Sequence, residues 1–149
     1  RERGWDQPGV GDALRRVGCP VLDAALTKHS GGCHCGRVRF EVSASASVAV
    51  AECNCSICAK SAYLHLIVPK SRFRLLKGEQ FLTTYSFNTG VAKHHFCKVC
   101  GIKSFYVPRS DPDGVSVNAR CLDPGTVTSM EVKPFDGRNW EASIRRKSW

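Results

Sequence analysis

The sequence predicts a mainly β domain of short antiparallel sheets that are held together by metal sites and followed by a short C-terminal helix. Two observations predict this fold: short segments in which apolar and polar residues alternate, and cysteines that occur in close pairs. The chain has 149 residues, of which 42% are hydrophobic. This length and composition suit one compact domain with a buried core.

The alternation that is typical of β-strands occurs in several short segments. They cover residues 37–42, 47–52, 63–68, 73–76, 81–87, 93–96, 102–107 and 114–118. Pro69, Gly78 and the runs 88–90 and 111–114 separate them, and residues of these types favour turns. Many short strands joined by turns indicate antiparallel pairing.

The two ends of the chain differ from its strand-rich middle. Residues 1–23 are rich in Gly and interrupted by Pro, and we expect an N-terminal extension there. Residues 136–146 have helical spacing, with Trp140 and Ile144 on one face and Asp136 as the N-cap. The domain is therefore expected over residues 24–144, and a basic tail over 145–149. Because the chain begins at Arg1 rather than at Met, we expect it to be part of a longer protein.

Seven of the nine cysteines lie in three close groups. These groups are Cys33-His34-Cys35, Cys53-Asn54-Cys55-Ser56-Ile57-Cys58 and Cys97-Lys98-Val99-Cys100. Close pairs separated by long intervals build tetrahedral thiolate sites, because each pair binds one side of a metal ion. An odd number of cysteines in pairs too close to bridge argues against a disulfide scaffold. We therefore expect zinc-bound thiolates in a reducing intracellular compartment, the cytoplasm or the nucleus.

The middle group has three cysteines, and this number predicts a different kind of site. Two pairs make a closed four-cysteine site that stabilises the fold, whereas three protein ligands leave a fourth position open to water or substrate. The alternative is that a further side chain closes the site. The residues that would do so are His34, His65, His94, His95 or Cys121. The spacing leaves both alternatives open.

The net charge bears on the class of partner. The formal charge is +9, from 22 Lys and Arg against 13 Asp and Glu. Such a charge suits an anionic partner or an ordinary solvated surface equally well. We find no interleaving of aromatic and basic residues along a strand, which argues against a zinc ribbon that reads nucleic acid. No stretch approaches the roughly 20 apolar residues that cross a bilayer, so we expect no membrane partner.

The order and surroundings of the seven cysteines resemble the glutathione-dependent formaldehyde-activating enzyme family. The resemblance rests on the runs GGCHCG (31–36), CNCSIC (53–58) and FCKVCG (96–101), and it spans about residues 24–140. The runs YSFNT (85–89) and SFYVPRS (104–110) are more similar to the animal branch of the family that includes centromere protein V.

The resemblance implies an Mss4-like fold with two zinc ions per chain. A structural zinc would be held by Cys33, Cys35, Cys97 and Cys100. A catalytic zinc would be held by Cys53, Cys55 and Cys58. The implied activity is that of a carbon–sulfur lyase, the reversible condensation of glutathione with formaldehyde to S-hydroxymethylglutathione. The centromere protein V branch implies the alternative, a non-catalytic zinc module in chromatin or centromere organisation and cell division, with chromatin or microtubule partners.

Other side chains are candidates for binding the substrate. Glutathione, or a related thiol, carries carboxylates, so Lys or Arg is expected to hold it. The candidates by sequence proximity are Lys60, Lys93 and Arg109. His94 or His95 would donate to a thiolate or act as acid and base, or would be a satisfied structural histidine, the alternative that we favour from the sequence. Only one of two neighbours in a strand points inward. Cys19 and Cys121 match no ligand position of the family, and we expect both to be ordinary thiols.

Overall fold

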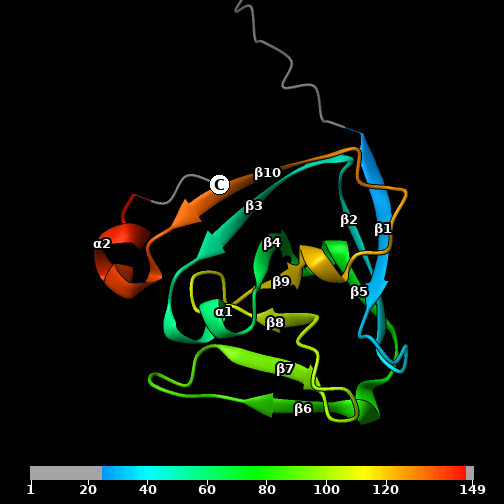
Figure 1. Ribbon diagram of the computed structural model, residues 1–149, viewed down its shortest axis with the longest axis horizontal. Coiled ribbons are helices and arrows are strands. Elements are labelled where there is room, and N and C mark those ends of the chain that lie inside the picture. The colour runs from blue at the N-terminus through cyan, green and yellow to red at the C-terminus, as the bar shows by residue number, and fades with distance from the viewer. Residues whose placement is uncertain (1–24, 147–149) are drawn as a thin grey trace, which may run out of the picture.

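The computed structural model describes residues 25–146, which form two β-sheets. The predicted N-terminal extension, with Cys19, lies outside the described residues, as do residues 147–149. The smaller sheet has the order β1-β2-β5, made of β1 (Leu26–Gly32), β2 (Arg39–Ser45) and β5 (Phe73–Lys77). Figure 1 shows this sheet along one side of the molecule.

The larger sheet has the strand order β10-β3-β4-β9-β8-β7-β6. Its strands are β3 (Ser47–Cys53), β4 (Leu64–Pro69), β6 (Leu82–Tyr85), β7 (Lys93–Cys97), β8 (Phe105–Val107), β9 (Gly114–Asn118) and β10 (Ser129–Phe135). All neighbours pair antiparallel except β10 and β3, which run parallel from Ser129 opposite Ser47 to Phe135 opposite Cys53. The larger sheet is therefore mixed.

The predicted mainly β fold is confirmed, and each predicted segment overlaps a strand. The expected antiparallel pairing holds for every neighbouring pair except β10 with β3, and the sequence did not indicate β10. This strand is exposed along most of its length and contains Pro134, so it lacks the alternation of a half-buried strand. Strand β1 was also missed, because its sequence, LTKHSGG, is polar and ends in two glycines.

One hydrophobic core draws side chains from both sheets. Phe40 of β2 is fully buried, and its ring lies 5.6 Å from that of Phe73 and 6.1 Å from that of Phe105 between ring centroids. Val50 and Val117 of the larger sheet belong to the same cluster. A second, smaller cluster joins Cys58, Tyr63 and Tyr106. It lies where the cysteine-containing loop after β3 meets the larger sheet.

The α-helices are short. Helix α1 (Ser56–Lys60) follows β3, and α2 (Trp140–Ile144) follows a 3₁₀ turn at Gly137–Asn139. The predicted helix over 136–146 is thus confirmed in type, but the α-helix is shorter: Asp136 is the N-cap of the 3₁₀ turn, and Asn139 is the N-cap of α2. The carboxylate of Asp136 accepts hydrogen bonds from the side-chain amides of Asn54 and Asn139. None of the described helices has the length and apolar character that crossing a membrane requires.

We predict that Phe40→Ala lowers the free energy of unfolding by about 3–5 kcal/mol, because it leaves a cavity where two sheets share their core. Equilibrium urea unfolding measures the loss. The control is Leu76→Ala, which truncates a side chain that is 44% exposed and should cost less than about 0.5 kcal/mol. Equal losses in the two variants would contradict the placement of Phe40 in the core.

Candidate metal centres and the adjoining cavity

The structure gathers four cysteines where the two sheets meet. The sulfurs of Cys33, Cys35, Cys97 and Cys100 all lie within 4.8 Å of one another. The distance from Cys35 Sγ is 3.5 Å to Cys33 Sγ and 3.7 Å to Cys97 Sγ. Four sulfurs arranged tetrahedrally at about 2.3 Å from a zinc ion would be about 3.8 Å apart, so this spacing fits a tetrahedral metal.

Local backbone structure places these sulfurs. Cys33 and Cys35 lie in the turn between β1 and β2, and the N–H of Val38 donates to Cys33 Sγ at 3.3 Å. Cys97 ends β7, and the N–H of Gly101, at φ +73°, closes the next turn by donating to the carbonyl of Cys97 at 2.7 Å. A backbone hydrogen bond from Arg37 lowers the pKa of Cys35 to about 6, which favours the thiolate form that metals bind.

A second cluster joins the three cysteines of the middle group. Cys53 ends β3, Cys55 precedes α1, and Cys58 lies buried on α1, with their sulfurs within 4.8 Å of one another. Hydrogen bonds with Cys53 and Cys58 hold the pKa of Cys55 below its ordinary value, whereas hydrogen bonds with Cys53 and Cys55 raise the pKa of Cys58. The three thiols therefore titrate as one unit.

No fourth His, Cys, Asp or Glu from residues 25–146 joins the three-cysteine cluster. His34 is exposed, and His95 Nδ1 pairs with Thr84 Oγ1 at 2.8 Å. Cys121 is not part of either cysteine cluster. His65 and His94 share a cavity with the cluster but are not grouped with it. Of the two alternatives, this arrangement favours the open three-ligand site.

The segment after β10 holds the loop that carries the three cysteines. Asn54 makes three bonds to it: its Nδ2 donates to Asp136 at 2.9 Å, its Oδ1 accepts from Arg138 N at 3.1 Å, and its carbonyl accepts from Arg138 Nε at 3.3 Å. Gly137 packs so closely that a Cβ there would lie 2.3 Å from Cys53 Sγ and 2.9 Å from Cys55 Cβ. Only glycine fits this contact.

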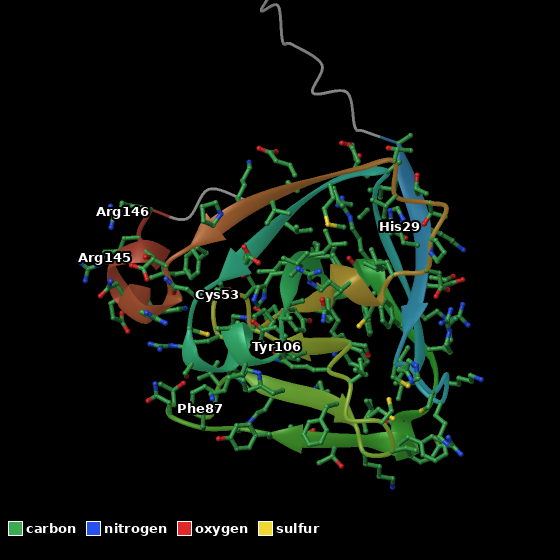
Figure 2. All side chains as sticks on the ribbon, viewed as in Figure 1. His29, Cys53, Phe87, Tyr106, Arg145 and Arg146 are labelled. Carbon is green, nitrogen blue, oxygen red and sulfur yellow. The ribbon has the colours of Figure 1, made fainter. Side chains whose placement is uncertain are left out.

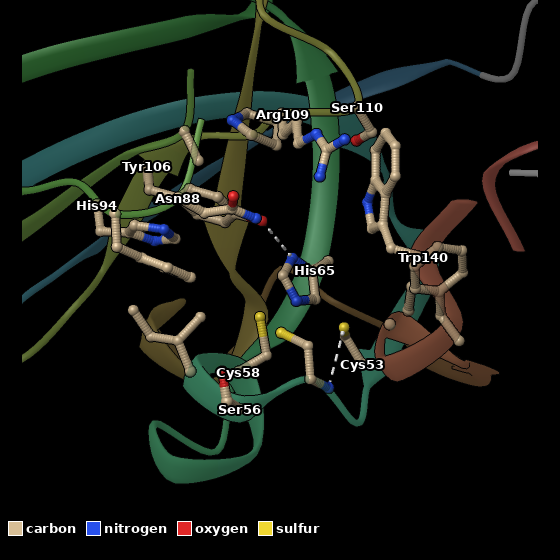
Figure 3. A pocket seen from close by; sticks show the side chains of 18 of the residues that line it. Cys53, Ser56, Cys58, His65, Asn88, His94, Tyr106, Arg109, Ser110 and Trp140 are labelled. Carbon is tan, nitrogen blue, oxygen red and sulfur yellow. Dashed lines mark hydrogen bonds between the residues drawn. The ribbon is translucent and has the colours of Figure 1, made fainter. Parts of the chain in front are cut away.

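A cavity of about 470 Å³ opens beside the three-cysteine cluster. All three cysteines line it, together with the loop at Phe87–Thr89, the 3₁₀ turn after β10 and Trp140 of α2. Figure 2 places Cys53, Tyr106 and Phe87 in this part of the molecule. Figure 3 shows Cys53 and Cys58 at one end of the cavity, with His94 and Trp140 on opposite sides. The cluster thus faces a space in which a small molecule would fit.

Two arginines line this cavity. The guanidinium of Arg109 lies 3.8 Å from the centroid of the Trp140 ring and donates to Glu141 Oε1 at 2.8 Å. Arg138, which the sequence analysis missed, lies beside the cysteine loop. Lys60 and Lys93 are exposed and do not line the cavity, so of the three predicted cationic residues the structure brings only Arg109 to it.

The two adjacent histidines of β7 point to opposite faces, as the strand period predicts. His94 lines the cavity, whereas the His95 ring packs against Phe105 of the main core, 5.6 Å between centroids. His65 of β4 also lines the cavity. Burial, reinforced by the charge of Lys103, lowers the pKa of His65 and of His94 to about 4, so both are neutral at pH 7.

We predict that Gly137→Ala weakens metal binding at the three-cysteine cluster, because the new methyl group would overlap Cys53 Sγ and force the loop and the turn apart. Native mass spectrometry should show one bound metal ion in place of two. Ala142→Ser, an exposed change on α2, is the control and should keep both ions. Two ions retained in Gly137→Ala would contradict the importance of this contact.

Comparison with known proteins agrees with this arrangement. The family model described as "glutathione-dependent formaldehyde-activating enzyme" matches residues 28–139, a range that contains both cysteine clusters. The chain is also similar to the crystal structure of a Rhodobacter sphaeroides protein, a structural genomics target. The two share 32% sequence identity with a TM-score of 0.60, over 70% of this chain and 99% of that one. The chain therefore belongs to the glutathione-dependent formaldehyde-activating enzyme family.

Proposed function

We propose that the protein is a carbon–sulfur lyase that catalyses the reversible condensation of glutathione with formaldehyde to S-hydroxymethylglutathione. The observation that carries the proposal is the three-cysteine cluster, which has no fourth ligand among the described residues and faces a cavity of about 470 Å³. That volume lies within the range of small-molecule sites, about 300–1,000 Å³. Membership of the family supports the same reaction.

Both clusters are proposed to hold zinc. Thiolate ligands in a tetrahedral arrangement favour Zn²⁺ over the harder divalent ions, which prefer oxygen. The four-cysteine cluster would be closed and structural, and the three-cysteine cluster would be the catalytic one. A zinc ion at the latter supplies a further coordination position at which a substrate sulfur or oxygen can be held.

The cavity walls suit glutathione in charge and in polarity. Glutathione has two carboxylates, and Arg109 and Arg138 are the two arginines that line the cavity. Arg109 is held at the cavity wall by the ring of Trp140 and the carboxylate of Glu141, so less side-chain freedom is lost when an anion binds there. Ile57 and Ile67 supply apolar wall against which the substrate backbone would pack.

The condensation needs orientation more than strong activation. The glutathione sulfur forms a bond to the formaldehyde carbon, the π pair of the carbonyl moves to its oxygen, and the thiol proton ends on that oxygen. Cys53, Cys55 and Cys58 would, as thiolates, donate strongly to a shared zinc ion, which would weaken its action as a Lewis acid. Holding sulfur and carbon in reacting geometry is therefore the larger contribution that we assign to the cavity.

We predict that the wild-type protein binds two zinc ions and that Cys55→Ser binds one and loses activity, because the cluster would keep only two thiolates. Native mass spectrometry counts the ions. NMR exchange spectroscopy between glutathione and S-hydroxymethylglutathione measures the rate above the spontaneous reaction. Cys121→Ser is the control, since Cys121 belongs to neither cluster, and it should keep both ions and the full rate.

A wild-type protein that binds both ions but gives no acceleration would contradict the enzymatic proposal. It would favour the alternative, a non-catalytic zinc module of centromere protein V type with chromatin or microtubule partners, for which the net charge of +9 is the supporting observation.

We predict that Arg109→Ala and Arg138→Ala each raise KM for glutathione about tenfold, with a smaller effect on kcat, because each removes a charge-assisted hydrogen bond to a carboxylate. Steady-state exchange rates at several glutathione concentrations separate the two parameters. Lys60→Ala removes an exposed charge outside the cavity and should leave KM unchanged. Wild-type KM values in both arginine variants would contradict their role in binding.

A further inference from the structure

His94 is held in the wall of the cavity with both faces of its ring covered. The side chain is 4% exposed. Its ring stacks on Phe87, 5.4 Å away at 19°, and on Tyr106, 5.0 Å away at 14°. Tyr106 pairs with His94 across β7 and β8, whereas Phe87 follows β6 on the other side of β7, so the two rings cover opposite faces. Only the ring edges remain for polar contacts.

One edge of the ring binds Lys103, and this contact decides where the imidazole proton lies. Lys103 Nζ is 2.8 Å from His94 Nδ1 and is held over the Tyr106 ring at 4.1 Å and the Tyr63 ring at 4.8 Å. Burial lowers the pKa of Lys103 to about 8, so at pH 7 it is largely an ammonium group, which donates and cannot accept. His94 Nδ1 therefore accepts, and a neutral ring that accepts at Nδ1 carries its proton on Nε2.

The other edge of the ring is an unused donor. His94 Nε2 is buried and has no hydrogen-bond partner among the described residues. His94 lines the cavity with the three cysteines, and Lys103 already occupies Nδ1, so Nε2 is the ring nitrogen that is left to bind a ligand. His65 Nε2 is also unpartnered. Its Nδ1, however, lies near two hydroxyls, Ser116 at 3.2 Å and Tyr106 at 3.3 Å, which can donate or accept, so its proton is not assigned.

We propose that His94 is a catalytic residue that donates a hydrogen bond from Nε2 to the oxygen of the one-carbon unit, and that Lys103 is the positioning residue that holds His94 in this tautomer. The proposal rests on the condensation proposed above. As the carbon–sulfur bond forms, the carbonyl π pair moves onto the oxygen, and a donor aimed at that oxygen binds it more strongly than it binds the neutral carbonyl. The thiol proton ends on the oxygen, so His94 is unchanged after the reaction.

The tautomer can be measured without substrate. In ¹⁵N-labelled protein at pH 6.5, long-range nitrogen–proton correlation spectra should show His94 neutral with its proton on Nε2, and His94→Gln assigns the signal by its loss. Lys103→Met should shift the ring toward a mixture of tautomers, whereas Lys93→Met, an exposed neighbour on the same strand, should not. A wild-type ring that carries its proton on Nδ1, or a Lys103→Met ring unchanged from wild type, would overturn the proposal.

Kinetics test the role of the donor. We expect His94→Phe, which keeps an aromatic ring between Phe87 and Tyr106, to lower kcat about 100-fold with KM for glutathione changed less than about threefold. His94→Gln, whose amide places an N–H near the position of Nε2 but not in its exact geometry, should recover about tenfold of this loss and so keep kcat about tenfold below wild type. Zinc content shows whether each variant is folded.

The outcomes separate this inference from the proposed function. If the wild type is active and a zinc-loaded His94→Phe variant is equally active, the role of His94 is overturned and the proposed reaction still stands. A wild type that does not accelerate adduct formation would overturn the proposed reaction and the role of His94 in it. Should His94→Phe fail to bind zinc, the comparison of His94→Gln with wild type decides: a Gln variant that keeps KM but loses part of kcat supports the proposal, and one that matches wild type contradicts it.

Discussion

The four-cysteine cluster is the constraint on which the rest of the structure depends. It joins the turn between β1 and β2 of the smaller sheet to the end of β7 in the larger one. Strand β7 also carries His94, three residues before Cys97, so the group that connects the sheets positions a wall of the cavity as well. The shared core around Phe40 adds apolar contacts between the same two sheets. Stability and the geometry of the site thus depend on one junction.

The parallel strand β10 positions the three-cysteine loop, as β7 positions His94. It runs beside β3 from end to end, so Phe135 lies opposite Cys53 and the chain that follows must pass next to the cluster. Gly137 permits the close approach, and Asn54 bonds the two segments together. Arg138 and Trp140 reach the cavity only because of this path. A strand with almost no buried side chains is therefore central to the site.

The cations near the cavity complement the negative charge of the ionised cysteine cluster. The cysteine cluster becomes negative when its thiols ionise, and Lys103, Arg109 and Arg138 are the cations placed around it or along the cavity. His65 and His94 stay neutral because burial opposes their protonation. They consequently offer hydrogen bonds without adding charge, which suits the proposed reaction, in which an oxygen gains negative charge only as the bond forms.

The sequence by itself identified seven cysteines as candidate metal ligands, most of the strands, and the opposite orientation of His94 and His95. It could do so because ligand spacing and the two-residue strand period are local properties. Which cysteines share a cluster, and which cations reach the cavity, was decided by tertiary structure. Arg138 meets Asn54 across 84 positions in the chain, and β10 has no alternation that would reveal its partner. Lys60 and Lys93 are close to cysteines in sequence yet point to solvent. Contacts between distant segments depend on how the sheets pack, and no local pattern encodes that packing.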